Sequence, residues 1–148
     1  MSLDDPYDLN RFLVAQEGVY ERALAELKGG QKRTHWMWYI FPQIAGLGYS
    51  PAAKRYSIKS REEALQYLSH PLLGKRLSEC TEAVLALKGG TVSEIFGYPD
   101  DLKFKSSMTL FEKMAGPGSV FSAALERYCR GERDAATLKL LEKHIPPE

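Results

Sequence analysis

The chain has 148 residues, of which 44% are hydrophobic and 26% charged, and its formal net charge is +1. Length and composition indicate a single domain over residues 1–148, and the balanced charge argues against nucleic acid or an anionic membrane as a partner. No apolar run approaches the roughly 20 residues of a membrane span, and two cysteines make no disulfide framework, so we expect a soluble cytoplasmic protein.

The first part of the chain shows the apolar spacing of helices. From Asp8 to Lys28 apolar residues fall on one stripe with a period of about 3.6, which predicts one helix that stops at Gly29-Gly30. Ser50-Pro51 is typical of an N-cap followed by proline at the first helical position. The stretch "SREE" (Ser60 to Glu63) is a capping box and predicts another helix.

Between these helices lies the segment "HWMWYIF" (35–41), which is apolar on nearly all sides. Its aromatic content favours a strand, but it lacks clean alternation. A segment of this kind is usually buried in either conformation. We expect a short central helix that is capped by Thr34 and ends near Pro42.

The second half of the chain predicts further helices. They are expected at 71–87, after the capping box "TVSE" (91–94), at 100–115 with Asp100 or Asp101 as the cap, after Ser119 and after Asp134. The sequence therefore predicts an all-α fold, a single-domain orthogonal bundle of six to eight helices.

The aromatic segment and the residues after it form the first candidate site. Its members are His35, Trp36, Trp38, Tyr39 and Gln43. The imidazole is either a general base or ligand contact, or a hydrogen-bonded core histidine. The aromatic rings either stack on a flat heterocycle or pack as core, and the amide is available for polar recognition of a ligand.

The second candidate site lies at the start of the helix predicted at 100–115. Asp100 and Lys103 are its charged members, and Ser107 follows the lysine by one turn. A buried Lys–Ser pair can activate a hydroxyl if burial lowers the pKa of the lysine. The alternative is a serine hydroxyl that donates to the Lys103 carbonyl while the lysine stays in solvent.

Two further polar residues are candidates for ligand binding. Gln16 falls on the apolar stripe of the first predicted helix, where its amide either makes a structural hydrogen bond to a loop carbonyl or contacts a ligand. Arg76 is a possible anion contact. The three histidines and two cysteines lack metal-ligand spacing, and "GLG" (46–48) is no dinucleotide fingerprint, so we expect neither metal nor cofactor.

Several motifs together resemble a known family. They are "DPYDLNRF" (5–12), "KRTHWMWYIFPQIAGLG" (32–48), "HPLLG" (70–74) and "DDLKFKSSMTLF" (100–111). They are similar to the bacterial and fungal family of unknown function DUF1810, over roughly residues 5–141. The resemblance implies one all-α domain with its core at about 5–141 and without an assigned reaction. It also implies that the segments 35–48 and 100–111 form one composite site.

A weaker resemblance covers the C-terminal part of the chain. The residues that carry it are Asp100, Lys103, Met108, Phe111 and Phe121. They are similar to the NADAR family of helical N-glycosidases, which act on ribosylated or ADP-ribosylated compounds. This resemblance implies that an enzymatic activity, if there is one, is that of a hydrolase.

Two functions of different class stay open. In the first, the protein binds or processes a small nucleotide- or ribose-like ligand in a cleft between 35–48 and 100–111, with His35, Asp100 and Lys103 as candidate catalytic residues. In the second, it is a protein-interaction module without enzymatic activity, and the aromatic segment is plain core. A pocket lined by the two tryptophans and by polar groups supports the first, and full burial without a pocket supports the second.

Overall fold

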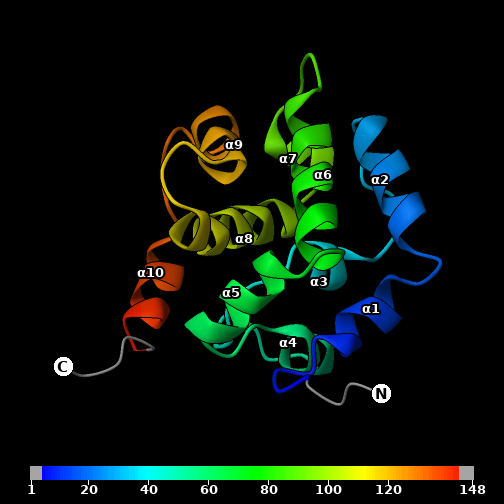
Figure 1. Ribbon diagram of the computed structural model, residues 1–148. Helices are drawn as coiled ribbons and strands as arrows, with labels where there is room; N and C mark the ends of the chain where they lie inside the picture. The colour runs from blue at the N-terminus through cyan, green and yellow to red at the C-terminus, as the bar shows by residue number, and fades with distance from the viewer. Residues whose placement is uncertain (1–4, 144–148) are drawn as a thin grey trace.

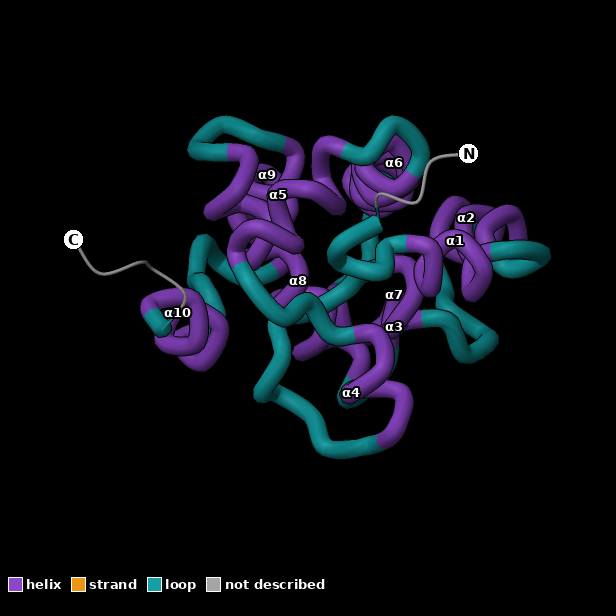
Figure 2. Tube along the Cα trace, turned by 60° about the horizontal axis from the view of Figure 1, so that its bottom comes forward, coloured by secondary structure: helices purple, strands orange, loops and turns teal. Residues whose placement is uncertain are grey.

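The computed structural model describes residues 5–143, which form ten α-helices (Figure 1). They are α1 (Asn10–Gln16), α2 (Tyr20–Lys28), α3 (Met37–Ile40), α4 (Pro51–Tyr56), α5 (Arg61–Ser69), α6 (Leu73–Leu85), α7 (Val92–Phe96), α8 (Asp100–Ala115), α9 (Val120–Tyr128) and α10 (Ala135–Glu142). Over residues 5–143 no strand forms, and the one extended pairing is an isolated parallel bridge between Ile44 and Ile58 (Figure 2).

The all-α fold is confirmed. The helices outnumber the six to eight expected because several are only one or two turns long. Residues 1–4 and 144–148 of the expected domain lie outside the described part.

The single helix predicted over 8–28 is wrong, because the chain forms two helices there. α1 ends at Gln16 and α2 begins at Tyr20, and between them Gly18 has a φ of +69°. Glycine adopts this backbone conformation readily, and a helix cannot continue through it. The apolar period misled the prediction because both helices turn their apolar sides towards the same core.

α3 begins later than expected, at Met37, and Thr34 does not cap it. The Thr34 hydroxyl instead donates to Oε2 of Glu26 at 2.7 Å, and Trp36 precedes the helix without a side-chain cap. His35 therefore lies outside the helix, so the expected effect of the helix dipole on its imidazole does not apply. The short central helix itself is confirmed, and Trp36 is 1% exposed.

Five predicted N-caps are confirmed. The side-chain oxygens of Ser50, Ser60, Thr91, Ser119 and Asp134 each accept the backbone N–H of the third residue on. Such caps satisfy one of the N–H groups that a helix start leaves unpaired. The cap predicted for the helix at 100–115 is wrong, because Pro99 occupies the N-cap position of α8 without a side-chain cap, and both aspartates after it lie inside the helix.

α8 is the central helix of the molecule. It packs against α5, α7, α9 and α10, and Figures 1 and 2 show it enclosed between these helices. Every residue from Ser106 to Glu112 is buried, so the middle of the helix has no solvent face. The hydroxyls of Ser106 and Thr109 donate to the carbonyls of the fourth residue before each, which pairs them inside the helix.

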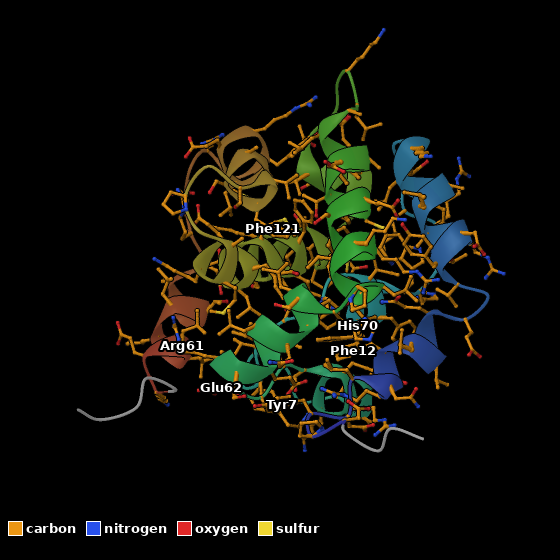
Figure 3. The ribbon with its side chains drawn as sticks, viewed as in Figure 1. Tyr7, Phe12, Arg61, Glu62, His70 and Phe121 are labelled. Carbon is orange, nitrogen blue, oxygen red and sulfur yellow. The ribbon has the colours of Figure 1, made fainter. Side chains whose placement is uncertain are left out.

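Aromatic rings fill the core on both sides of this helix. Phe121 of α9 packs against Phe111 of α8 with 5.9 Å between ring centroids. Phe12 of α1 packs edge-on against Tyr67 of α5 at 5.0 Å. Figure 3 labels Phe12 and Phe121, which lie on different sides of the interior. These contacts join the N-terminal helices and the C-terminal helices into one core.

A buried ion pair ties α1 to α4 and α5. The side chains of Arg11 and Glu63 are 4% and 3% exposed, and Nη2 of Arg11 lies 2.6 Å from Oε2 of Glu63. The other N–H groups of the guanidinium donate to the backbone carbonyls of Tyr7, Asp8, Arg55 and Ser57. Each polar group of this charged side chain therefore has a partner, as burial of a charge requires.

Both cysteines, Cys80 and Cys129, are buried free thiols, in line with the expectation that they make no disulfide framework. Burial raises the pKa of the Cys80 thiol to about 12, which keeps it protonated and unreactive. Among the helices of residues 5–143, none combines the length and the apolar character that crossing a membrane requires.

Candidate functional site

A hollow of about 210 Å³, here called the first hollow, opens between the segment that leads into α3 and the N-terminal end of α8. It is lined by Lys32, His35, Trp36, Met37, Trp38, Tyr39, Ala52, Asp100 and Lys103. The structure therefore brings the two candidate segments to one place, and most of the predicted site residues lie there together. In Figures 1 and 2, α3 and α7 can be found near this end of α8.

Two lysines share one carboxylate in the first hollow. Nζ of Lys32 lies 2.8 Å from Oδ2 of Asp100, and Nζ of Lys103 lies 3.2 Å from Oδ1. The side chains of Lys32, Asp100 and Lys103 are 8%, 18% and 25% exposed, so the charges are partly removed from water. An ammonium has three N–H donors, and each lysine uses one of them on Asp100. The group keeps an excess positive charge and spare donors.

Each of these lysines also lies over an indole ring. Nζ of Lys32 is 5.2 Å from the ring centroid of Trp36, and Nζ of Lys103 is 4.6 Å from that of Trp38. The electron-rich face of an indole attracts a cation at such distances, which helps to fix both ammonium groups. Trp36 is core, whereas Trp38 is half-buried and forms a wall of the hollow. Full burial of both tryptophans without a pocket is therefore not observed.

Glu26 holds the segment that carries the first hollow. Its Oε1 accepts the backbone N–H groups of Arg33 and Thr34 and the indole N–H of Trp36, at 2.7, 3.0 and 2.9 Å. Its Oε2 accepts the Thr34 hydroxyl. Partial burial raises the pKa of the Glu26 carboxyl, but these hydrogen bonds together lower it by more, to about 2.

His35 and Asp100 differ in the number of partners that their side chains have. The His35 side chain is exposed at the hollow and makes no hydrogen bond to the other residues of 5–143. Both carboxylate oxygens of Asp100 are bound by lysines. Asp100 therefore holds the two ammonium groups in place, whereas the His35 imidazole has no hydrogen-bond partner among the described residues.

Gln43 lies outside the first hollow, in a neighbouring one of about 240 Å³, here called the second hollow. This hollow is lined by Trp38, Gln43, Leu47, Gly48, Pro99, Leu102, Lys103, Ser106 and Asp134. Trp38 and Lys103 line both hollows, so the two adjoin across these side chains. Gln43 is 3% exposed, and its Nε2 is buried without a hydrogen-bond partner among the described residues.

Ser107 is part of neither hollow. Its side chain is fully buried, and its hydroxyl has no hydrogen-bond partner within residues 5–143. The expected bond to the Lys103 carbonyl is not formed, and the ammonium of Lys103 binds Asp100 instead of the serine. The structure therefore contains neither form of the Lys–Ser pair that the sequence spacing indicated.

Gln16 and Arg76 lie apart from both hollows and bind each other. Nε2 of Gln16 donates to the Tyr39 carbonyl at 2.8 Å, and its Oε1 accepts from Nη1 of Arg76 at 3.0 Å. The guanidinium lies 4.5 Å from the ring centroid of Tyr20. The amide thus makes a structural hydrogen bond to a backbone carbonyl, as one of its two interpretations held, but the acceptor Tyr39 lies in α3 and not in a loop.

Two residues that position the site were not among the sequence candidates. Lys32 stands directly before the aromatic segment, where its sequence context is that of a solvated lysine. Glu26 lies on α2, and its four hydrogen bonds reach residues 7 to 10 positions later in the chain. No local pattern marks either residue, because the partners of both are set by the tertiary fold.

Gly48 makes room for Trp38. A Cβ atom placed on Gly48 would lie 2.9 Å from Cβ of Ala53 and 3.3 Å from Cη2 of Trp38. We therefore expect Gly48→Ala to lower the free energy of unfolding by about 1–3 kcal/mol and to change the tryptophan emission spectrum. Denaturant unfolding checks the first effect. Gly89→Ala is the matched control, since no atom lies within 4 Å of its added Cβ, and equal stability of both variants would contradict the prediction.

The comparison with known proteins identifies the family. A family model described as "Protein of unknown function (DUF1810)" matches residues 6–141. The chain belongs to the DUF1810 family. One solved structure similar to this DUF1810 chain is that of the conserved hypothetical protein Rv1873 from Mycobacterium tuberculosis. It is 52% identical with a TM-score of 0.91, and the match covers 93% of this chain and 99% of that one.

These findings support the first resemblance and add nothing to the second. No match was found among curated proteins. The match to the DUF1810 model lends no support to the resemblance to the NADAR N-glycosidases. Within residues 5–143, no three side chains of His, Cys, Asp or Glu are placed to hold a metal ion together. The geometry of the two hollows therefore carries the functional argument for this member of DUF1810.

Proposed function

We propose that the first hollow binds a small anionic ligand of the nucleotide or sugar-phosphate class. The observation that carries the proposal is the arrangement of Lys32 and Lys103 around one carboxylate, with 2.8 and 3.2 Å between the paired atoms. Asp100 cancels one of the two positive charges, so an anion of matching charge finds an attractive site. Phosphate oxygens accept hydrogen bonds from ammonium groups, which suits the spare donors of both lysines.

The walls of the first hollow favour a sugar or a ring next to that anion. Trp38, Tyr39 and His35 line the first hollow beside the lysines and supply flat rings there. The volume of about 210 Å³ is below the ~300–1,000 Å³ typical of pockets for drug-sized ligands. One moiety, such as a sugar phosphate, therefore fits better than a whole dinucleotide.

Binding is the activity that the arrangement supports most directly. Hydrolysis of a bound N-glycoside is the enzymatic form of the same hypothesis, and proton transfer would then fall to His35. Asp100 is unsuited to that role, because both of its oxygens are held by cations. The proposal therefore concerns binding first, and hydrolysis would be tested with whichever ligand binds.

Replacement of Lys32 by alanine tests the proposal. Calorimetric titration with ribose 5-phosphate should show at least about a ten-fold weaker affinity in Lys32→Ala than in the unmodified protein, because half of the cationic pair is lost. Lys113→Ala is the matched control, since Lys113 is exposed near the other end of α8. Rising salt should also weaken binding. Equal affinity in the two variants, or no binding of the sugar phosphate by the unmodified protein, would refute the proposal.

A further inference from the structure

We infer that the ligand site continues past Trp38 into the second hollow, which takes a nucleobase, so that the ligand is a nucleoside monophosphate. The inference rests on the proposed function, in which the first hollow takes the phosphate and sugar. It adds the nature of the second half of the ligand and a residue, Gln43, that determines specificity.

The two hollows are placed to hold two parts of one molecule. They share Trp38 and Lys103, and their volumes are about 210 and 240 Å³. Each is of a size for one moiety of a nucleotide. Lys103 lies between them with its ammonium over the Trp38 ring, so a phosphate bound at the lysines leaves the rest of the molecule next to that ring.

An unpaired amide marks the second hollow as a binding surface. Gln43 is 3% exposed and lines the hollow, while its Nε2 has no hydrogen-bond partner among the described residues. Buried amide groups without partners are rare in native proteins. Rotation of the amide plane by half a turn exchanges the nitrogen and the oxygen, so either can face a molecule in the hollow. The nearby hydroxyl of Ser106 is paired with the Leu102 carbonyl and does not compete for the amide.

The chemistry of the second hollow matches the edge and the face of a base. A carboxamide offers a donor and an acceptor side by side, and this pair fits the donor and acceptor pattern on the edge of a nucleobase. Leu47, Pro99 and Leu102 give the wall an apolar part, while Asp134 adds a carboxylate whose Oδ2 accepts the Thr137 N–H and hydroxyl. The Trp38 ring supplies a surface on which a base can stack. Gly48 keeps the space beside that ring free of a side chain.

Calorimetric titrations with two classes of probe test the inference. The probes are ribose 5-phosphate and the 5′-monophosphates of adenosine, guanosine, cytidine and uridine. We expect at least one nucleotide to bind about ten-fold tighter than ribose 5-phosphate. Gln43→Leu should abolish this excess and leave the affinity for ribose 5-phosphate unchanged. Gln66→Leu, at an exposed glutamine of α5, is the matched control.

Stability shows whether the Gln43→Leu variant is properly folded. Because the Nε2 of Gln43 is buried without a partner, leucine should leave the melting temperature unchanged or raise it. A lowered melting temperature would contradict the picture of an unpaired amide.

The outcomes separate this inference from the proposed function. Equal affinity for ribose 5-phosphate and all four nucleotides, with the Lys32 effect present, would refute the second compartment and keep the proposed function. An equal loss for both probe classes in Gln43→Leu would also refute it. A nucleotide affinity that depends on Gln43 and not on Lys32 would keep the base compartment and refute the proposed function. Failure of every probe to bind would overturn both.

Discussion

Replacing Arg11 by methionine is expected to lower the free energy of unfolding by about 3–5 kcal/mol. The change leaves the Glu63 carboxylate buried without its cation, and it also removes the donors of four backbone carbonyls. Removal of one partner from a buried pair costs far more than the net value of the pair, since the other charge stays dehydrated. Urea unfolding followed by circular dichroism measures the loss.

Two further variants sharpen this test. Arg55→Met removes an exposed ion pair with Asp8, whose side chains are 58% and 60% exposed, and should change stability by less than about 1 kcal/mol. The double variant Arg11→Met, Glu63→Leu should recover part of the loss, because no unpaired charge is left. A loss below about 1 kcal/mol in Arg11→Met would show that the pair is not the link between α1, α4 and α5.

Replacing Glu26 by glutamine is expected to lower the free energy of unfolding at neutral pH by about 2 kcal/mol. The carboxylate accepts four hydrogen bonds, and glutamine offers one oxygen where the carboxylate has two. These hydrogen bonds hold the segment Lys32–Trp36 in place. The affinity for ribose 5-phosphate should therefore fall as well. Chemical unfolding and calorimetric titration of the same samples measure both effects.

The acid limb of the stability profile gives an independent check on Glu26. The pKa of its carboxyl is about 2 in the folded protein against an ordinary 4.5, so its contribution is fully present above about pH 4.5 and is lost as the pH falls towards about 2. The unmodified protein should therefore lose stability more steeply over this interval than Glu26→Gln does. Glu21→Gln, at an exposed site of α2, should follow the unmodified profile. Parallel profiles for the unmodified protein and Glu26→Gln would exclude the hydrogen-bonded carboxylate.

Local chemistry made five of the helix starts predictable. Ser60 caps α5 as its sequence indicates, since an N-cap depends only on the next three residues. The second half of the predicted capping box is wrong, because the Glu63 side chain does not accept the Ser60 N–H. Oε1 of Glu63 accepts the N–H of Lys59 at 2.9 Å, and Oε2 binds Arg11 from another part of the chain. A tertiary partner that carries a full charge outweighs a local backbone donor.

The location of the candidate site could be predicted from the sequence better than the ion pairs and hydrogen bonds within it. The segments 35–48 and 100–111 are apolar with a few polar residues, and burial of the apolar parts brings His35, Asp100 and Lys103 to the first hollow. Which polar group meets which is set by distances in space. The sequence therefore paired Lys103 with Ser107 on one helix, whereas the fold pairs Lys103 with Asp100 and adds Lys32 from far away in the chain.

The burial of α8 has a consequence for the mobility of the cleft. The stretch Ser106–Glu112 is covered by helices on all sides, so its backbone amides reach water only in openings close to global unfolding. The opposite wall comes from an irregular segment that ends in the single turn of α3, where small local fluctuations suffice for hydrogen exchange. The α8 wall of the first hollow, Asp100 and Lys103, lies within about two turns of this protected stretch, whereas the other wall is compliant. A molecule that contacts both walls is therefore expected to slow hydrogen exchange at the backbone amides of residues 32–36.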